Sequence, residues 1–249
     1  MKAIQHHIYA IKVCFEALSK GKYLTFFIPG LFVGLFYYWA FSSTEELKES
    51  ATTLDSVPLV GEYLVSGAQG FIGFWQGILL FIFQFFILTI LSPFNSILSE
   101  KFDADLTGRK FETGFVRILN DLLRAILVAI IALVLECIFM VVWIILSWIL
   151  SWLPLIDLLD PIMRFLIGSF FFGFAFYDYS LERHNIGTFR SLGFAFSKMG
   201  HMIISGSIFT LIFMIPIVGI ILAPVLVTLI STGVYIKLNE KTGTPTQTQ

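Results

Sequence analysis

ILSPFNSILSEKFDADLTGR, residues 90–109, closes a long apolar run and then becomes polar and charged. Pro93 predicts a break in the helix, because proline lacks the backbone N–H and clashes with the preceding turn. The residues after it are expected to continue as an amphipathic, charged helix with Gly108 as its C-cap. We therefore predict that the chain leaves a bilayer here, on a defined side.

The composition indicates an integral membrane protein. Apolar residues make up 57% of the chain, against roughly 45–50% in soluble domains, and the mean hydropathy is +0.87. Several apolar runs approach the ~20 residues that a spanning helix needs, and they lack the alternation of barrel strands. We predict an all-α membrane protein of one domain over residues 1–249, without a cleavable signal peptide and with a disordered tail at 240–249.

Four runs are expected to cross the bilayer: 23–41, 71–91, 125–150 and 162–177. In the first run, Gly30 and Gly34 form a small-residue face that favours close helix approach. The fourth run is short for a full crossing, since about 16 residues at ~1.5 Å each reach only ~24 Å. The two cysteines, Cys14 and Cys137, are expected to be packing residues rather than a disulfide.

The amphipathic N-terminal segment, residues 1–22, has apolar side chains at helical spacing. Ile4, Ile8, Ile11, Phe15 and Leu18 form one stripe. This pattern is compatible with a helix lying on the bilayer and equally with a helix packed on the bundle.

The distribution of charge predicts the orientation. Residues 42–67 are acidic and are expected to form an external loop, whereas 92–124 and 178–200 are rich in Lys and Arg and are expected to be cytoplasmic. Of the 16 Lys and Arg, all but Lys48 and Arg164 then lie on the cytoplasmic side. Both termini are predicted to be cytoplasmic.

The last apolar run, 202–236, contains Pro216, Gly219 and Pro224 near its centre. Arms of about 12–14 residues, ~18–21 Å, are too short for two full crossings, so we expect a re-entrant hairpin. Backbone at its tip must be buried in protein or line a wet cavity, which points to a pore, a binding site or a structural plug.

Few side chains suggest chemistry within the membrane. Glu136 interrupts an apolar run and is a candidate for a pore or proton site, the alternative being a protonated residue between helices. Arg109, Arg117 and Arg124 form a candidate basic vestibule for anions, or serve only to set topology. Asp178, Glu182, Arg183 and His184 are expected to form a surface ion-pair network.

Enzyme signatures are not found in the sequence. It has no phosphate-binding G-x-x-x-x-G-K-[ST] loop, no H-E-x-x-H motif and no ligand spacing among His6, His7, His184 and His201. We expect neither an enzyme nor a bound cofactor or metal, and no nucleic-acid partner.

An ordered set of short motifs resembles the CysZ sulfate permease family, within the etoposide-induced-protein superfamily. The motif residues are Pro93, Phe94, Asn95 and Glu100, then Asp178 in Tyr-Asp-Tyr, followed by the Pro216 and Pro224 landmarks. The resemblance implies an all-helical protein of the bacterial inner membrane with spanning helices and hemi-penetrating hairpins. It also implies homo-oligomers, dimeric or higher, and sulfate uptake for cysteine synthesis.

The resemblance also implies a substrate site at the start of the first span. CysZ proteins carry Pro-Gly-x-Arg-Arg there, whereas this chain has Lys20, Gly21, Lys22, Tyr23 and Leu24. Lys22 and the amides of 21–24 are the expected sulfate donors. A permease for another solute and a non-transporting membrane organiser with the same fold remain alternatives.

Overall fold

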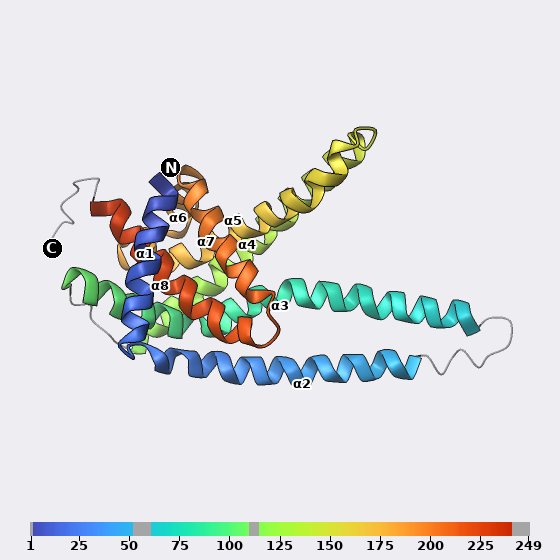
Figure 1. The fold of residues 1–249 in the computed structure, drawn as a ribbon, viewed down its shortest axis with the longest axis horizontal. Coiled ribbons are helices and arrows are strands. Elements are labelled where there is room, and N and C mark those ends of the chain that lie inside the picture. Colours follow the sequence, from blue (N-terminus) through green and yellow to red (C-terminus); the bar gives the residue numbers. More distant parts are fainter. Residues whose placement is uncertain (1, 52–60, 110–114, 241–249) are drawn as a thin grey trace.

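The computed structural model describes residues 2–51, 61–109 and 115–240, and these form helices and their connections (Figure 1). The elements are α1 (Lys2–Ser19), the short 3-10 helix η1 (Leu24–Phe26), α2 (Phe27–Ala51), α3 (Gly61–Thr107), α4 (Phe115–Ile149), α5 (Leu155–Arg183), α6 (Thr188–Ser197), α7 (Met199–Phe213) and α8 (Val218–Glu240). The all-helical prediction is confirmed. The predicted disordered tail lies outside the described residues.

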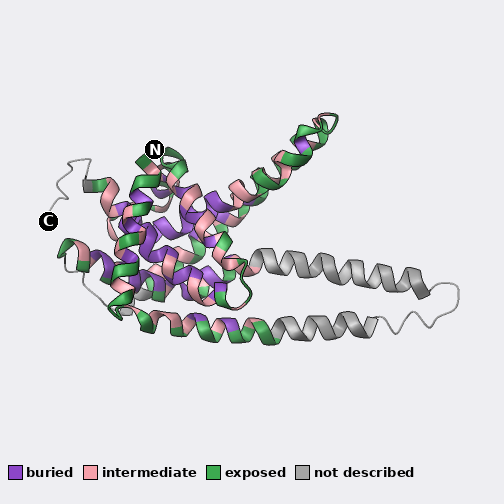
Figure 2. Cartoon of the chain, viewed as in Figure 1, coloured by how far each residue is buried: buried purple, intermediate pink, exposed green. Residues whose placement is uncertain are grey.

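Two helical hairpins project from a packed body. Figure 1 shows α2 running beside α3, and α4 beside α5, away from a body that contains α1, α6, α7 and α8. Buried residues gather where the inner ends of α3, α4 and α5 join that body (Figure 2). Among the described side chains, large exposed apolar residues are frequent on α2 and α4.

Two of the described helices are long and apolar enough to cross a membrane, and they differ in how far they are buried within the protein. In α4, residues Leu119–Ile149 are mostly exposed, whereas in α8, Val218–Asn239 are largely buried. An exposed apolar helix is suited to lipid contact, while α8 packs against α1, α2, α3, α5 and α7. Helices α6 and α7 form a third, broken apolar segment, bent by 95°.

The predicted break at Pro93 is wrong. Helix α3 continues through Pro93 over 47 residues and ends at Thr107, followed by Gly108 at φ +73°. Leu91 and Ser92 before the proline, and Asn95 and Ser96 after it, are buried. Tertiary packing on both sides thus holds a helix that loses one backbone hydrogen bond. The predicted C-cap at Gly108 is confirmed, since its amide donates to Ala104 O at 2.8 Å.

Several helices are longer than predicted. Helix α2 extends to Ala51 and α3 begins at Gly61, so both enter the segment predicted as a loop at 42–67. Helix α5 has 29 residues, ~43 Å at 1.5 Å each, because Pro161 lies inside it and Asp178 to Arg183 continue it. The fourth predicted crossing, residues 162–177, is therefore part of a helix long enough to span a bilayer.

The predicted hairpin at 202–236 is present, but its arms are unequal. The turn lies at residues 214–217, where Ile217 has φ +61°, and Pro224 is inside α8. Helix α8 has 23 residues, ~34 Å, so the prediction of two short arms is wrong for this arm. The sharp bend of the bundle lies instead at Lys198, between α6 and α7.

Helix α1 packs on the body through a face that includes only part of its apolar stripe. His6, His7, Ala10 and Cys14 are buried, whereas Ile4, Ile8 and Phe15 are at least half exposed. Ile11 and Leu18 of the stripe are partly buried against the core. The packed alternative is thus confirmed, and the exposed part of the stripe faces outward, where a bilayer can contact it.

Glycines allow helix backbones to touch at two crossings. A Cβ at Gly30 would lie 3.1 Å from Ile221 Cα, which confirms the predicted small-residue face of α2. The α5–α7 crossing is closer: a Cβ at Gly206 would overlap Ser169 O, and one at Gly173 would overlap Met202 O. These atoms are backbone, so a side chain there cannot be accommodated by a rotamer change.

We expect Gly206→Ala to destabilise the protein by about 3 kcal/mol or more, because it forces α5 and α7 apart. Gly193→Ala is the matched control, since nothing lies within 4 Å of a Cβ at that helical position. The measurement is the thermal unfolding midpoint of each variant in detergent. Equal midpoints for the two variants would contradict this account of the crossing.

Candidate functional site

The candidate substrate segment Gly21–Leu24 is a tight turn between α1 and η1. Gly21 and Tyr23 both have left-handed backbone, with φ +76° and +64°. The amides of Gly21 and Lys22 donate to Leu18 O and Ala17 O, so the turn also closes the end of α1. A left-handed tyrosine is unfavourable by itself and needs contacts that hold it in place.

Those contacts come from the last turns of α3. Lys22 Nζ and the Tyr23 hydroxyl both donate to Asp105 Oδ2, at 2.7 and 2.6 Å. The Tyr23 ring packs edge-on against Phe102, with centroids 5.8 Å apart. The hydrogen bonds from Lys22 and Tyr23 lower the pKa of Asp105, so its carboxyl is ionised at neutral pH.

A cavity of about 240 Å³ opens beside this turn, between α1 and α3. It is lined by Val13, Glu16, Ala17, Lys20, Lys22, Tyr23, Phe102, Asp105 and Leu106. Lys20 Nζ lies 2.6 Å from Glu16 Oε1, so both lysines of the cavity are paired with carboxylates. The formal charges of its lining cancel, and these carboxylates compete with an external anion for the two lysines.

Arg124 lies in a buried ion pair. Its Nε and Nη2 donate to the two carboxylate oxygens of Asp178 at 3.0 and 2.8 Å. Nη2 also donates to Ile186 O and Ser191 Oγ, at 2.7 and 3.0 Å. This guanidinium therefore joins α4, α5 and α6. Its role in an anion pathway stays a prediction.

The expected surface network around Arg183 is wrong, because its members are largely buried. The side chains of Arg183 and Asp103 are each 1% exposed and approach to 3.8 Å. Arg183 also donates to Ser99 Oγ at 2.6 Å and to Ser96 O at 3.3 Å. Ser99 in turn bonds Thr232 of α8, so this network joins α3, α5 and α8.

Burial shifts the pKa values of two neighbouring groups. The pKa of Glu182 rises to about 8, first because it is desolvated and then because Asp121 is near. The pKa of Arg183 falls to about 10 through desolvation, against the opposing effect of Asp103 and Glu100. Burial thus disfavours the charged form of both groups.

The family-motif residues lie where α3, α4 and α5 meet. Glu100 pairs with Arg117 at 3.1 Å, Asn95 is buried, and Asp178 holds Arg124. Phe94 is exposed, and Pro93 lies within α3. These contacts hold the helices together in this conformation.

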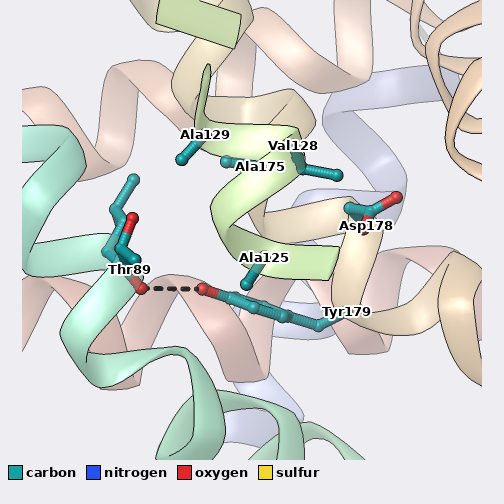
Figure 3. Close-up of a pocket in the computed structure, with 8 residues that line it drawn as sticks. Thr89, Ala125, Val128, Ala129, Ala175, Asp178 and Tyr179 are labelled. Carbon is teal, nitrogen blue, oxygen red and sulfur yellow. Dashed lines mark hydrogen bonds between the residues drawn. The ribbon is translucent and has the colours of Figure 1, made fainter. Parts of the chain in front are cut away.

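A second cavity adjoins the motif (Figure 3). Its lining includes Thr89, Ala125, Val128, Asp178 and Tyr179, and the Tyr179 hydroxyl donates to Leu88 O at 3.3 Å. Its volume of about 10 Å³ is enough for about one water molecule. A sulfate ion does not fit there in this conformation.

Glu136 is separated from the arginines with which it was grouped. It is 2% exposed on α4 and faces α5, where its Oε1 lies 3.2 Å from a Cβ built on Gly168. Its Oε2 has no hydrogen-bond partner among the described residues. Arg124 is about 18 Å away along the helix, so the structure does not bring the pore candidates together.

Sequence analysis missed a histidine cluster, because its members are far apart in the chain. His6 Nδ1 of α1 lies 3.2 Å from His201 Nε2 of α7, and His7 lies beside both. No spacing in the sequence indicates this contact. Cys137 is exposed rather than packed, while Cys14 is buried, and both thiols are free.

We expect Arg124→Ala to destabilise the fold by about 3–5 kcal/mol, because it leaves Asp178 buried without its counter-ion. Arg164→Ala is the matched control: Arg164 also bonds an aspartate, Asp160, but that pair is exposed. Chemical denaturation of both variants in detergent measures the difference. A similar, small loss of unfolding free energy in both variants would show that burial of the Arg124 pair is unimportant for stability.

Comparison with known proteins agrees with this architecture. Residues 16–224 match the model of a family described as "Sulfate transporter CysZ/Etoposide-induced protein 2.4". No curated protein matches the chain. The matched residues include the turn at Gly21–Leu24, the α3 motif and Asp178. The chain is a multi-pass membrane protein and belongs to the CysZ/etoposide-induced protein 2.4 family.

Proposed function

We propose that this protein is a permease for small oxyanions, with sulfate as its substrate and cysteine synthesis as the use of that sulfate. The observation that carries the proposal is the convergence of Lys22 Nζ and the Tyr23 hydroxyl on one carboxylate oxygen. Two donors at a tight turn thus already bind an oxyanion, at the positions where the family resemblance implies sulfate. Family membership supports the choice of anion.

In this proposal, the Asp105 carboxylate occupies the position on Lys22 and Tyr23 that sulfate would take. A sulfate that reaches the cavity replaces the carboxylate on Lys22 and Tyr23, and Asp105 turns away. Because Asp105 is ionised at neutral pH, it competes with sulfate and also repels it. Affinity is therefore expected to be lower than with a pair of arginines, whose guanidinium groups bind oxyanions through two parallel bonds.

Orientation and assembly follow the same proposal. We place the protein in the bacterial inner membrane as a homo-oligomer with both termini in the cytoplasm. The tip of the α4–α5 hairpin carries Trp148 and Trp152, 76% and 75% exposed, a residue type enriched at membrane interfaces. The Arg124 pair lies near the other end of α4. This arrangement supports a crossing of the bilayer between the two.

One observation favours a second candidate, a non-transporting membrane organiser with the same fold. Lys22, Arg117 and Arg124 each contact a carboxylate. Cations held in this way stabilise contacts between helices without binding a substrate. Anion flux distinguishes the two candidates.

In proteoliposomes, we expect Lys22→Ala to raise the sulfate concentration for half-maximal uptake about fivefold, because one charge-assisted bond is lost at a partly exposed site. Asp105→Asn is expected to lower it, because the competing charge is removed while the side-chain size is kept. The measurement is the initial rate of radiolabelled sulfate uptake.

Lys12→Ala is the control for general loss of positive charge, since Lys12 is exposed on α1 and does not line the cavity. Empty vesicles give the background rate. Uptake equal to that background by folded wild-type protein would exclude the permease and favour the organiser. Uptake that is unchanged by both cavity variants would place the anion site elsewhere.

Glu136 is the proposed proton site if uptake is coupled to a proton gradient, because it is the buried acid of the exposed α4 helix. We expect Glu136→Gln to abolish the stimulation of sulfate uptake by an imposed pH gradient while leaving passive uptake intact. Stimulation equal to that of the wild type would assign Glu136 a packing role.

A further inference from the structure

Three imidazoles meet where α1 packs on α7. The ring centroids of His6 and His7 lie 5.4 and 5.9 Å from that of His201. His6 and His7 are buried in this contact, and Ser205 of α7 lies next to them. Because α1 carries no other buried polar side chain among its described residues, this cluster is the polar part of its attachment.

The contact between His6 and His201 requires one unprotonated ring nitrogen. His7 Nδ1 donates to Ala3 O at 2.8 Å, and its Nε2 lies 2.9 Å from the Ser205 hydroxyl, which can donate to it or accept from it. His6 Nδ1 and His201 Nε2 face each other at 3.2 Å, so one of the two must accept. A proton added to the accepting nitrogen of the His6–His201 pair places two donors against each other.

The surrounding charges do not offset such a proton. The charged groups acting on His201 are His6, His7 and Lys198, all cationic when protonated. Helix α8, the other element packed on α1, brings Lys237, whose Nζ lies 4.8 Å from the Tyr9 ring centre. From α5 the cluster meets Tyr177, 3.4 Å from Ser205. The α1 carboxylate, Glu16, bonds Lys20 about 15 Å along the helix from His6.

The sign of the pH effect follows from His7. Burial lowers the pKa of His7 below its ordinary value near 6.5, because desolvation disfavours the imidazolium. The docked state therefore binds fewer protons than the undocked state. Docking is fully stable above about pH 6.5 and weakens as the pH falls below it.

We propose that His6, His7 and His201 form a pH-sensitive latch, which holds α1 on the body when neutral and releases it when protonated. Helix α1 runs directly into the turn at Gly21–Leu24, so its release would move Lys22 relative to Asp105. The latch would thus couple pH to the candidate substrate site. It rests on the α1–α7 contact and holds whether or not the protein carries sulfate.

Cys14 provides a direct reporter of α1 release. Its side chain is 0% exposed on the packed face of α1, whereas Cys137 is exposed on α4. In a Cys137→Ser protein in detergent, Cys14 is titrated with 4,4′-dithiodipyridine, which reacts with thiols in acid as well as at neutral pH. Each rate is divided by that of the denatured protein at the same pH. We expect the normalised rate to rise about tenfold or more between pH 8 and pH 5, the effect of one pKa unit of differential protonation.

The decisive variant carries His6→Gln, His7→Gln and His201→Gln in the Cys137→Ser background, since glutamine is polar but does not titrate. We expect the acid-induced rise to be lost or strongly reduced in it and retained in His184→Gln, a histidine that bonds Ser180 O on α5. A rate that is independent of pH in the parent protein would overturn the latch. So would an undiminished rise in the triple variant, or a rise that coincides with loss of helical circular dichroism.

Discussion

The direct backbone contact between α5 and α7 is the constraint on which the rest of the body depends. Gly173 and Gly206 bring the two helices so close that a methyl group would overlap carbonyl oxygens. The same crossing places Tyr177 of α5 next to Ser205 of α7, and through Ser205 next to His7 of α1. It also leaves the following residues of α5, from Asp178 to Arg183, directed toward α3 and α4. This steric condition thus influences the relative positions of five helices.

Buried ion pairs then complete the assembly. Arg124 joins α4 to α5 and α6 through Asp178, and Arg183 joins α5 to α3 through Asp103 and Ser99. Such pairs add little net stability compared with apolar contacts, but removing one partner leaves an unsatisfied charge. They therefore select one arrangement of the helices. In these pairs the positive charge of each arginine is neutralised by an aspartate of the same protein, so it is less able to attract an external anion.

The same balance of charge appears at the turn between α1 and α2. Lys22 and Tyr23 hold Asp105, and Lys20 holds Glu16, around a cavity large enough for a small anion. Where the family resemblance implies two arginines, this chain has a phenol and an aliphatic side chain, and α3 supplies the carboxylate. The α1 helix, with its histidine cluster, is the element that can move this turn.

Some features could be predicted from the sequence because they depend on local chemistry. The length of the apolar runs predicted the helices, and the ordered motifs predicted the family. Gly108 predicted the end of α3, and Gly30 predicted the close approach of α2 to another helix, which is α8. Proline was misleading at residue 93, because packing on both sides compensates for one missing hydrogen bond, and local helix propensity does not include such packing.

Only the tertiary structure decided which charged and titratable groups meet. His6 and His201 are 195 residues apart, Lys22 and Asp105 83 apart, and Arg124 and Asp178 54 apart. No spacing rule reaches over such separations, since periodicity describes one helix at a time. The sequence by itself therefore determined an all-helical membrane protein of this family. The close α5–α7 crossing decided its polar contacts, because it sets which helix faces lie within hydrogen-bonding distance.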